Sequence, residues 1–193
     1  MGGILSDFPQ FATLLPTIRL VLKGANYFVA LDPMSTHTYI HCNLASMLRP
    51  EIVSSTRMCV NTLNGQATKE YKNVLISLPL ISKRVMAFIN NSLPVIQGYS
   101  KINFNVLKGV CSLTTLNELR FNTPWKETQI SALLGADCLP LVYKDYIRMY
   151  PHLCVGIGNT IYGSFAFGKF PVQQPPGNDN ATALSTSCRD KNF

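Results

Sequence analysis

The sequence lacks any uninterrupted run of 18 or more apolar residues, although 47% of its 193 residues are hydrophobic. A helix that crosses a bilayer needs about 20 such residues, so no transmembrane segment is expected. Charged residues are also scarce, at 14% of the chain, and no run of basic residues accompanies the net charge of +7. Because the basic residues are scattered singly and are not interleaved with aromatic ones, nucleic acid is disfavoured as a partner.

Closely spaced cysteine pairs are absent as well. The six cysteines are widely separated and form no C-x-x-C pair, which argues against zinc, and we expect no other metal or cofactor. The N-terminus shows no basic stretch followed by an apolar one, so it carries no sign of a secretory signal. We therefore expect free, mostly buried thiols in an intracellular, cytoplasmic protein. The first residues, 1–6, fit the N-myristoylation pattern, which makes Gly2 a candidate acceptor.

Composition divides the chain into three parts. Residues 1–13 are predicted to be an irregular lead-in, and residues 14–170 a single domain large enough to bury a core. Residues 171–193 are rich in Gln, Pro, Asn and small polar residues. Such a segment cannot bury enough apolar surface to offset its conformational entropy, so a disordered tail is predicted.

Short β-prone runs separated by turn residues dominate the predicted domain. Strands are expected at residues 19–23, 27–31, 36–40, 58–63, 67–78, 84–89, 130–135 and 160–168. Helical structure is expected at residues 43–48 with Asn43 as its cap, at 113–119, and briefly after 136. This pattern predicts a mostly-β domain, a closed or pseudo-barrel sheet with one or two short helices.

Asp32 is the candidate around which the chain is organised. It follows the apolar run Tyr27–Leu31 and begins the turn Pro33-Met34-Ser35. Aspartic proteases place a catalytic carboxylate in this way, on a turn after an apolar strand. Asp is also common before Pro in ordinary turns, so a plain turn acid is the alternative for Asp32 taken alone.

Three segments, taken in order, carry a family resemblance. They are Leu14–Thr17 with Ala30–Ser35, then Ile130–Asp137, then Asn159–Gly168. Together they resemble the aspartic protease domain of Bel/Pao-type LTR retrotransposons, a relative of the retroviral proteases, over roughly residues 14–169.

The resemblance implies a retropepsin-like fold and a homodimer that cleaves a peptide or polyprotein. Each chain would supply one catalytic aspartate, Asp32, to a site on the two-fold axis. Leu133, Leu134 and Gly135 would form the strand that packs beneath the active-site loop. Asn64, Gly65 and Gln66 would form the tip of a flap over the substrate.

The active-site loop departs from the family pattern of Asp, then Thr or Ser, then Gly. Pro33 has neither a hydroxyl nor an N–H, and Met34 brings a side chain to a position where a positive φ would be costly. Ser35 is a candidate replacement for the missing hydroxyl. We therefore predict impaired catalysis, with a non-catalytic dimerisation or peptide-binding module as the alternative and a basic β-module that binds nucleic acid as a third reading.

Other residues with reactive side chains have plainer interpretations. Asp137 is either a second catalytic acid or, as we expect, a cap or salt-bridge partner after Gly135. His37 and His41 are four apart, but on a strand that spacing does not form a metal pair and no third ligand is evident. Cys42 and Cys138 lack an evident His partner. The single tryptophan, Trp125, is expected in the core or at an interface.

Overall fold

The computed structural model describes residues 11–62, 65–98, 102–145 and 147–172. The myristoylation pattern, the flap candidate Asn64 and the tail from residue 173 therefore lie outside the described residues. The fold is mostly β, with 49% strand and 18% helix. The mostly-β prediction is confirmed.

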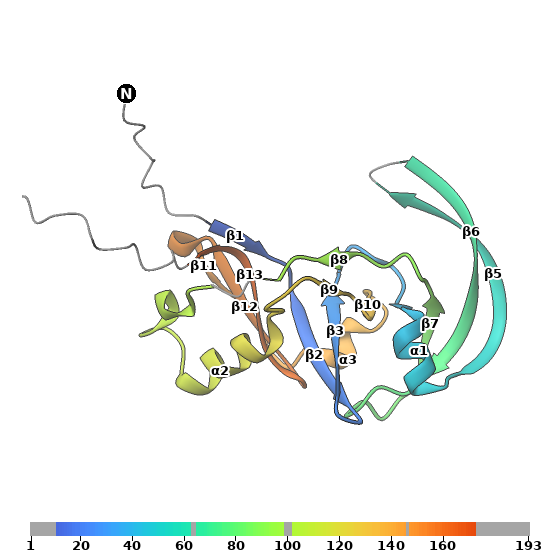
Figure 1. Ribbon diagram of the computed structural model, residues 1–193, viewed down its shortest axis with the longest axis horizontal. Coiled ribbons are helices and arrows are strands. Elements are labelled where there is room, and N and C mark those ends of the chain that lie inside the picture. Colours follow the sequence, from blue (N-terminus) through green and yellow to red (C-terminus); the bar gives the residue numbers. More distant parts are fainter. Residues whose placement is uncertain (1–10, 63–64, 99–101, 146, 173–193) are drawn as a thin grey trace, which may run out of the picture.

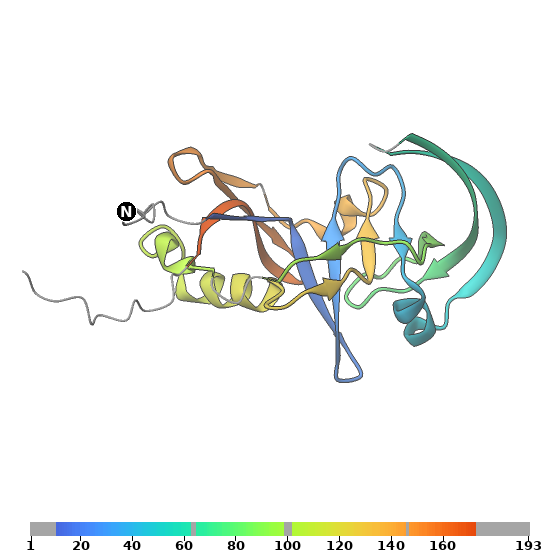
Figure 2. The ribbon, with the colours of Figure 1, turned by 45° about the horizontal axis from the view of Figure 1, so that its top comes forward.

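Three sheets make up the described fold (Figures 1 and 2). The seven-stranded sheet has the order β2 (Thr17–Leu22), β3 (Ala25–Leu31), β10 (Ala132–Leu134), β4 (Tyr39–Ile40), β7 (Val85–Ile89), β6 (Gly65–Ile76) and β5 (Glu51–Thr62). The four-stranded sheet has the order β1 (Phe11–Leu14), β13 (Gly163–Pro171), β12 (Val155–Thr160) and β11 (Arg148–Tyr150). The two-stranded sheet pairs β8 (Val95–Ile96) with β9 (Thr128–Gln129).

The predicted closed or pseudo-barrel sheet is wrong, because no closed barrel is found in the part of the chain that the structure describes. The edge strands β2 and β5 of the large sheet do not pair with each other. The long β5–β6 hairpin instead arches away at one end of the molecule, as Figure 1 shows. The four-stranded sheet and α2 lie at the opposite end.

Three α-helices and two 3-10 turns connect the strands: α1 (Cys42–Leu48), η1 (Phe104–Leu107), α2 (Leu113–Asn122), α3 (Leu139–Val142) and η2 (Pro151–Leu153). The cap of α1 is His41, whose side chain accepts from the Asn43 amide, so the predicted Asn43 cap is wrong by two positions. Helix α2 begins at its cap Ser112 and runs further than predicted, to Asn122.

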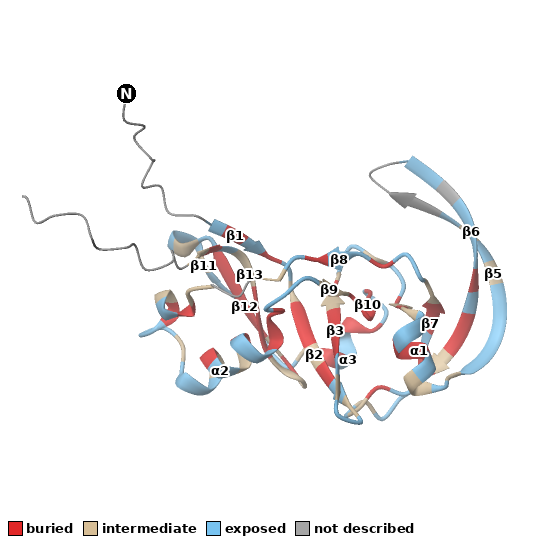
Figure 3. Ribbon diagram, viewed as in Figure 1, coloured by how far each residue is buried: buried red, intermediate tan, exposed pale blue. Residues whose placement is uncertain are grey.

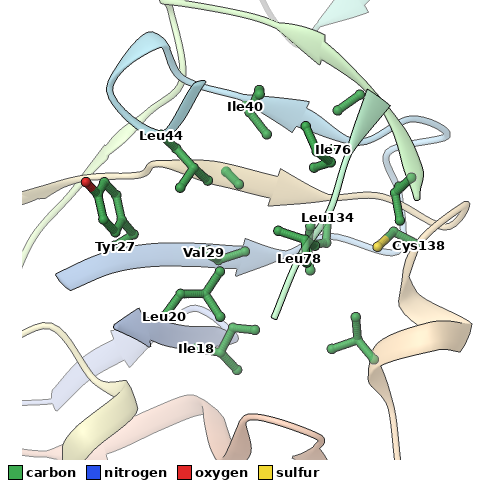
Figure 4. Packing of buried hydrophobic residues seen from close by; sticks show 14 of the residues in the cluster. Ile18, Leu20, Tyr27, Val29, Ile40, Leu44, Ile76, Leu78, Leu134 and Cys138 are labelled. Atoms are coloured by element: carbon green, nitrogen blue, oxygen red, sulfur yellow. The ribbon is translucent and has the colours of Figure 1, made fainter. Parts of the chain in front are cut away.

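The main core lies on one face of the seven-stranded sheet, against α1 and α3. Figure 4 shows its apolar side chains, which come from strands distant in sequence. Its fully buried members include Ile18, Val29, Ile40, Leu44, Ile76 and Leu134. Side chains on one face of β3, Tyr27, Val29 and Leu31, belong to this core, whereas Phe28 on the other face packs in a separate apolar cluster with Leu93, Ile96 and Ile130. Figure 3 shows that burial decreases toward the far end of the β5–β6 hairpin.

A second core joins α2 to the four-stranded sheet. It contains Leu14, Phe104, Leu107, Leu116, Leu119, Val155, Ile157, Ala166 and Phe170. Leu116 and Leu119 come from α2, and Phe104 stacks at a tilt on Phe170 with 5.4 Å between ring centroids. Strand β1 lies in this sheet, so the predicted irregular lead-in is wrong for residues 11–13.

The final strand predicted at residues 160–168 is present but starts three residues later, as β13 from Gly163. β12 ends at Thr160, which is paired with Gly163 across the turn between the two strands. The Thr160 hydroxyl donates to the Gly163 carbonyl at 2.8 Å and accepts from the Tyr162 amide at 3.1 Å. Gly163 has φ +98°, a conformation that a glycine adopts without strain. These hydrogen bonds form a turn at residues 160–163, although the composition of residues 160–168 predicts a continuous strand.

The prediction of mostly buried thiols is also wrong. Among the five cysteines in the described residues only Cys138 is buried, whereas Cys42, Cys59 and Cys154 are exposed. Trp125 is 61% exposed, so it is not a core residue, and its place at an interface stays a prediction.

Candidate functional site

Asp32 directly follows β3, at the edge where that strand leaves the sheet. Its amide donates to the Leu134 carbonyl at 3.0 Å, and its carboxylate accepts from the Met34 amide at 3.0 Å. The Ser35 amide closes the turn by donating to the Asp32 carbonyl at 3.2 Å. These bonds hold the carboxylate at a half-buried position next to the fully buried end of β3.

The loop that follows corrects one expectation. Met34 is not among the residues with positive φ, so the cost expected from a positive φ at this position does not arise. The Met34 amide points at the Asp32 carboxylate and donates to it. The Ser35 hydroxyl donates to the His37 carbonyl within the same loop. Pro33 and Met34 are exposed at the tip, with Met34 89% exposed.

Strand β10 lies between β3 and β4 and supports this loop from below. It is parallel to β3, with Leu133 opposite Ala30 and Leu134 opposite Leu31. Gly135 comes next, and a Cβ there would lie 2.5 Å from the His37 carbonyl oxygen. Only a residue without a side chain fits beneath the loop, and this requirement explains the glycine.

A second acid joins the two loops. Asp137 accepts from the Thr38 hydroxyl at 2.8 Å and from the Thr38 amide at 3.2 Å. Thr38 is fully buried, and its hydroxyl oxygen in turn accepts from the Gly135 amide at 3.2 Å. The prediction of a cap or salt-bridge partner at Asp137 is therefore wrong. The same bonds explain why the predicted strand 36–40 contains only Tyr39–Ile40: the Thr38 amide is used by a side chain.

An open pocket of about 570 Å³ lies between the Asp32 loop and β5. Its lining combines loop and strand residues: Met34, Ser35, Thr36, His37, Tyr39, Met58 and Cys59. Tyr39 packs against Tyr71 and Phe88, each with 5.8 Å between ring centroids. Burial raises the pKa of the Tyr39 phenol, and the nearby Tyr71 and Asp137 raise it further. Tyr39 is therefore neutral at physiological pH and presents an aromatic surface to the pocket.

The flap candidates lie on the hairpin beyond this pocket. Gly65 is the first residue of β6, with φ +115°, and Gln66 is exposed opposite Asn61. Neither lines the pocket; the hairpin contributes Met58 and Cys59 from β5. Sequence reasoning missed these two residues and Tyr39 as pocket residues. β5 begins at Glu51, seven residues before the predicted start at residue 58.

The remaining reactive side chains do not assemble into a metal centre. Within the described ranges, no group of three or more His, Cys, Asp or Glu side chains could hold a metal ion. The His37 ring packs edge-on against Phe88 at 5.2 Å, and His41 caps α1. Cys42 does have a His neighbour, 3.6 Å from its Sγ to His41 Nδ1, which corrects the prediction. That Nδ1 also accepts from the Asn43 amide.

Cys138 is the one buried thiol near the Asp32 loop. Burial raises the pKa of Cys138 to about 11; the Asp137 charge adds to the rise, and a hydrogen bond with Thr38 opposes it. A thiol with this pKa stays protonated at neutral pH and is a poor nucleophile. Cys138 therefore acts as a core residue.

Comparison with known proteins adds no relative: no protein-family model, curated protein or solved structure matches the chain. None of the helices in the described ranges is long and apolar enough to cross a membrane.

Proposed function

We propose that the chain is a retropepsin-like aspartic endopeptidase of the retroelement type, which processes a polyprotein as a homodimer. The observation that carries the proposal is the placement of Asp32 on a turn braced by β10, a distant strand parallel to β3. Because β3 and β10 are parallel, the turns that follow them meet at the sheet edge where Asp32 lies, and the Ala136 amide of one turn donates to the Ser35 carbonyl of the other.

The chemistry needs two copies of the chain. Asp32 is the one carboxylate placed on this turn, and a pair of carboxylates is required to activate water and to protonate the scissile carbonyl. A two-fold axis beside Asp32 would bring two identical carboxylates together. Two such groups held close cannot both ionise, so they share one proton; one acts as base on water and the other donates to the carbonyl.

The geometry of the Asp32 loop is closer to that of a working active site than the residues Pro33 and Met34 suggest. Met34 replaces the family's glycine without a positive φ and keeps its amide on the Asp32 carboxylate. The exposed Met34 side chain stands where a second copy would contact the loop. Pro33 still removes the hydroxyl that would tie the two loops together across a dimer. We therefore expect a dimer that is weaker than one with Thr or Ser at this position.

The pocket beside the loop is the candidate position for a substrate side chain. Its Met34, Tyr39 and Met58 side chains are apolar or aromatic, and its volume of about 570 Å³ lies in the range of ligand sites. An extended peptide lying between the Asp32 loop and β5 would place a large apolar side chain in it. Peptides with such a residue beside the scissile bond are the expected substrates.

The first experiment measures cleavage of a mixed peptide library at mildly acidic pH. It compares the native chain with Asp32→Asn and with the double variant Pro33→Ser plus Met34→Gly, and sedimentation gives the oligomeric state of each. Cleavage that Asp32→Asn abolishes would support the proposal. Cleavage by the double variant alone would indicate an intact scaffold with a lost active site. Folded dimers that never cleave would favour the non-catalytic dimerisation or peptide-binding module.

A further inference from the structure

The loop that carries Asp32 is held at two ends, and the second end depends on one exposed acid. At the first end, the Asp32 amide bonds to the Leu134 carbonyl at 3.0 Å. At the other end, Thr38 donates two hydrogen bonds to the Asp137 carboxylate, one from its amide and one from its hydroxyl. Between them the Ala136 amide donates to the Ser35 carbonyl at 2.8 Å. Hydrogen bonds between backbone groups and hydrogen bonds to one carboxylate therefore connect the loops 32–38 and 134–138.

The direction of the hydrogen bonds at Thr38 shows what Asp137 does. A hydroxyl has one proton, and Thr38 gives it to Asp137 Oδ1 at 2.8 Å. Its oxygen is then oriented to accept the Gly135 amide at 3.2 Å. Asp137 Oδ2 accepts the Thr38 amide at 3.2 Å. Without the carboxylate, the buried Thr38 amide loses its acceptor and its hydroxyl loses the partner that orients it.

The tip of the loop cannot replace this support. Pro33 has no N–H and no hydroxyl, and the Ser35 hydroxyl is used within the loop on the His37 carbonyl. Met34 is almost fully exposed. The position of the Asp32 carboxylate therefore depends on how firmly residues 35–38 are fixed to the 134–138 turn.

We infer that Asp137 is a positioning residue for Asp32, which acts by holding Thr38 and so fixing the loop between them. Both carboxylate oxygens of Asp137 accept from Thr38, and this use of the carboxylate favours a positioning role over the second catalytic acid that the sequence left open. The expected effect of Asp137 on catalysis rests on the proposed function. Its expected effect on the order of the loop rests on the loop geometry alone. A misplacement of about 1 Å at a reacting group can lower a rate about 100-fold.

The test compares Asp137→Ala and Asp137→Asn with the native chain, and uses Glu127→Ala, a change at an exposed carboxylate before β9, as the control. Asn keeps a carbonyl oxygen that can accept the Thr38 hydroxyl proton. We expect Asp137→Ala to lower kcat about 100-fold with KM changed less than about threefold. We expect Asp137→Asn to recover part of that loss, because the Asn carbonyl oxygen replaces one of the two carboxylate acceptors and its NH2 group cannot replace the other. A catalytic acid would lose its activity equally in both variants, so equal losses would overturn the inference.

A second measurement is independent of activity. Amide hydrogen exchange, followed by NMR in the full chain, reports the opening of the loop at Ser35, Thr38 and Gly135. We expect Asp137→Ala to accelerate exchange at Thr38 and Gly135 by at least tenfold, while exchange in β12 and β13 and with Glu127→Ala stays unchanged. If the native chain cleaves nothing, the proposed function fails but this measurement still decides the inference. Unchanged exchange at Thr38 and Gly135 would overturn it.

Discussion

Asn122 joins the two main sheets through a single buried amide, and its removal is a direct test of that role. It is the last residue of α2 and is 1% exposed. Its Oδ1 accepts from the Arg19 amide on β2 at 2.9 Å. Its Nδ2 donates to the Ser164 carbonyl on β13 at 2.8 Å and to the Tyr162 carbonyl at 3.4 Å. One side chain therefore covers the open edge of β2 and holds β13 beside it.

Asn122→Ala removes all three of these bonds. At about 1 kcal/mol for each hydrogen bond, the free energy of unfolding should fall by about 3 kcal/mol. Such a loss is a large part of the 5–15 kcal/mol or so that stabilises an ordinary domain. Urea unfolding followed by far-UV circular dichroism should show a lower midpoint with an unchanged slope.

Asn117→Ala is the matched control, because Asn117 lies on the exposed face of the same helix. Its Oδ1 accepts from Arg120 Nη1 at 3.2 Å, and both residues are exposed. The control should change the free energy of unfolding by less than about 0.5 kcal/mol. If Asn122→Ala costs no more than the control, the amide does not join the sheets and the reasoning fails.

Asn122→Asp adds a pH signature to the same test. An ionised carboxyl would face the Ser164 carbonyl oxygen, whereas a protonated one can donate to it. Burial and this contact raise the pKa of the introduced carboxyl in the folded state above its unfolded value of about 3.9. The variant should therefore be most stable below pH 4 and lose stability as the pH rises through the folded-state pKa. The deficit of Asn122→Ala should not follow this pH dependence.

Three further predictions concern the residues around the Asp32 loop. Gly135→Ala should lower the free energy of unfolding by about 1–3 kcal/mol in a urea titration, because the added Cβ would lie 2.5 Å from the His37 carbonyl oxygen. Ala136→Ser, a change at the exposed neighbouring residue, should alter the free energy of unfolding by less than about 0.5 kcal/mol. Leu134→Ala should cost about 2–5 kcal/mol by the same assay, since the side chain is 1% exposed in the main core; a smaller loss would mean that the core closes over the gap. In the folded protein Cys138 should resist alkylation at pH 8 while the exposed cysteines react, and labelling of Cys138 at the rate of the exposed thiols would contradict its burial. Because burial favours the neutral Cys138 thiol, the free energy of unfolding should fall as the pH rises from about 9 toward 11.

Local sequence signals predicted most of the strands and helices. Residues 84–89 were expected as a strand and form β7 at Val85–Ile89; residues 43–48 were expected as a helix and form most of α1. The strands expected at residues 58–63 and 67–78 lie largely within β5 and β6, which pair with each other up to Thr62 and Gly65. These features depend on alternation, capping and turn residues, which act between neighbours in the chain.

The errors arose where distant segments compete with local preference. Residues 36–38 have strand propensity, but Asp137 takes the Thr38 amide and removes it from any ladder. Strand β5 begins at Glu51, seven residues before the predicted start, because β6 pairs along its whole length. A barrel was expected from the number of strands, whereas the pairing of β1 with β13 places them in a separate sheet.

The sequence by itself determined the mostly-β class and the turn at Asp32, because each follows from the chemistry of a few adjacent residues, whereas the need for glycine at Gly135 comes from its tertiary contact with the His37 backbone. Only the tertiary structure placed β10 parallel to β3, brought Asp137 to Thr38, and put Met58 across a pocket from Met34. Asp137 and Thr38 are 99 residues apart in the chain, and nothing in either local pattern specifies the other. The physical reason is that contacts of this kind are selected by the packing of the whole core, in which apolar faces from distant strands must be buried together.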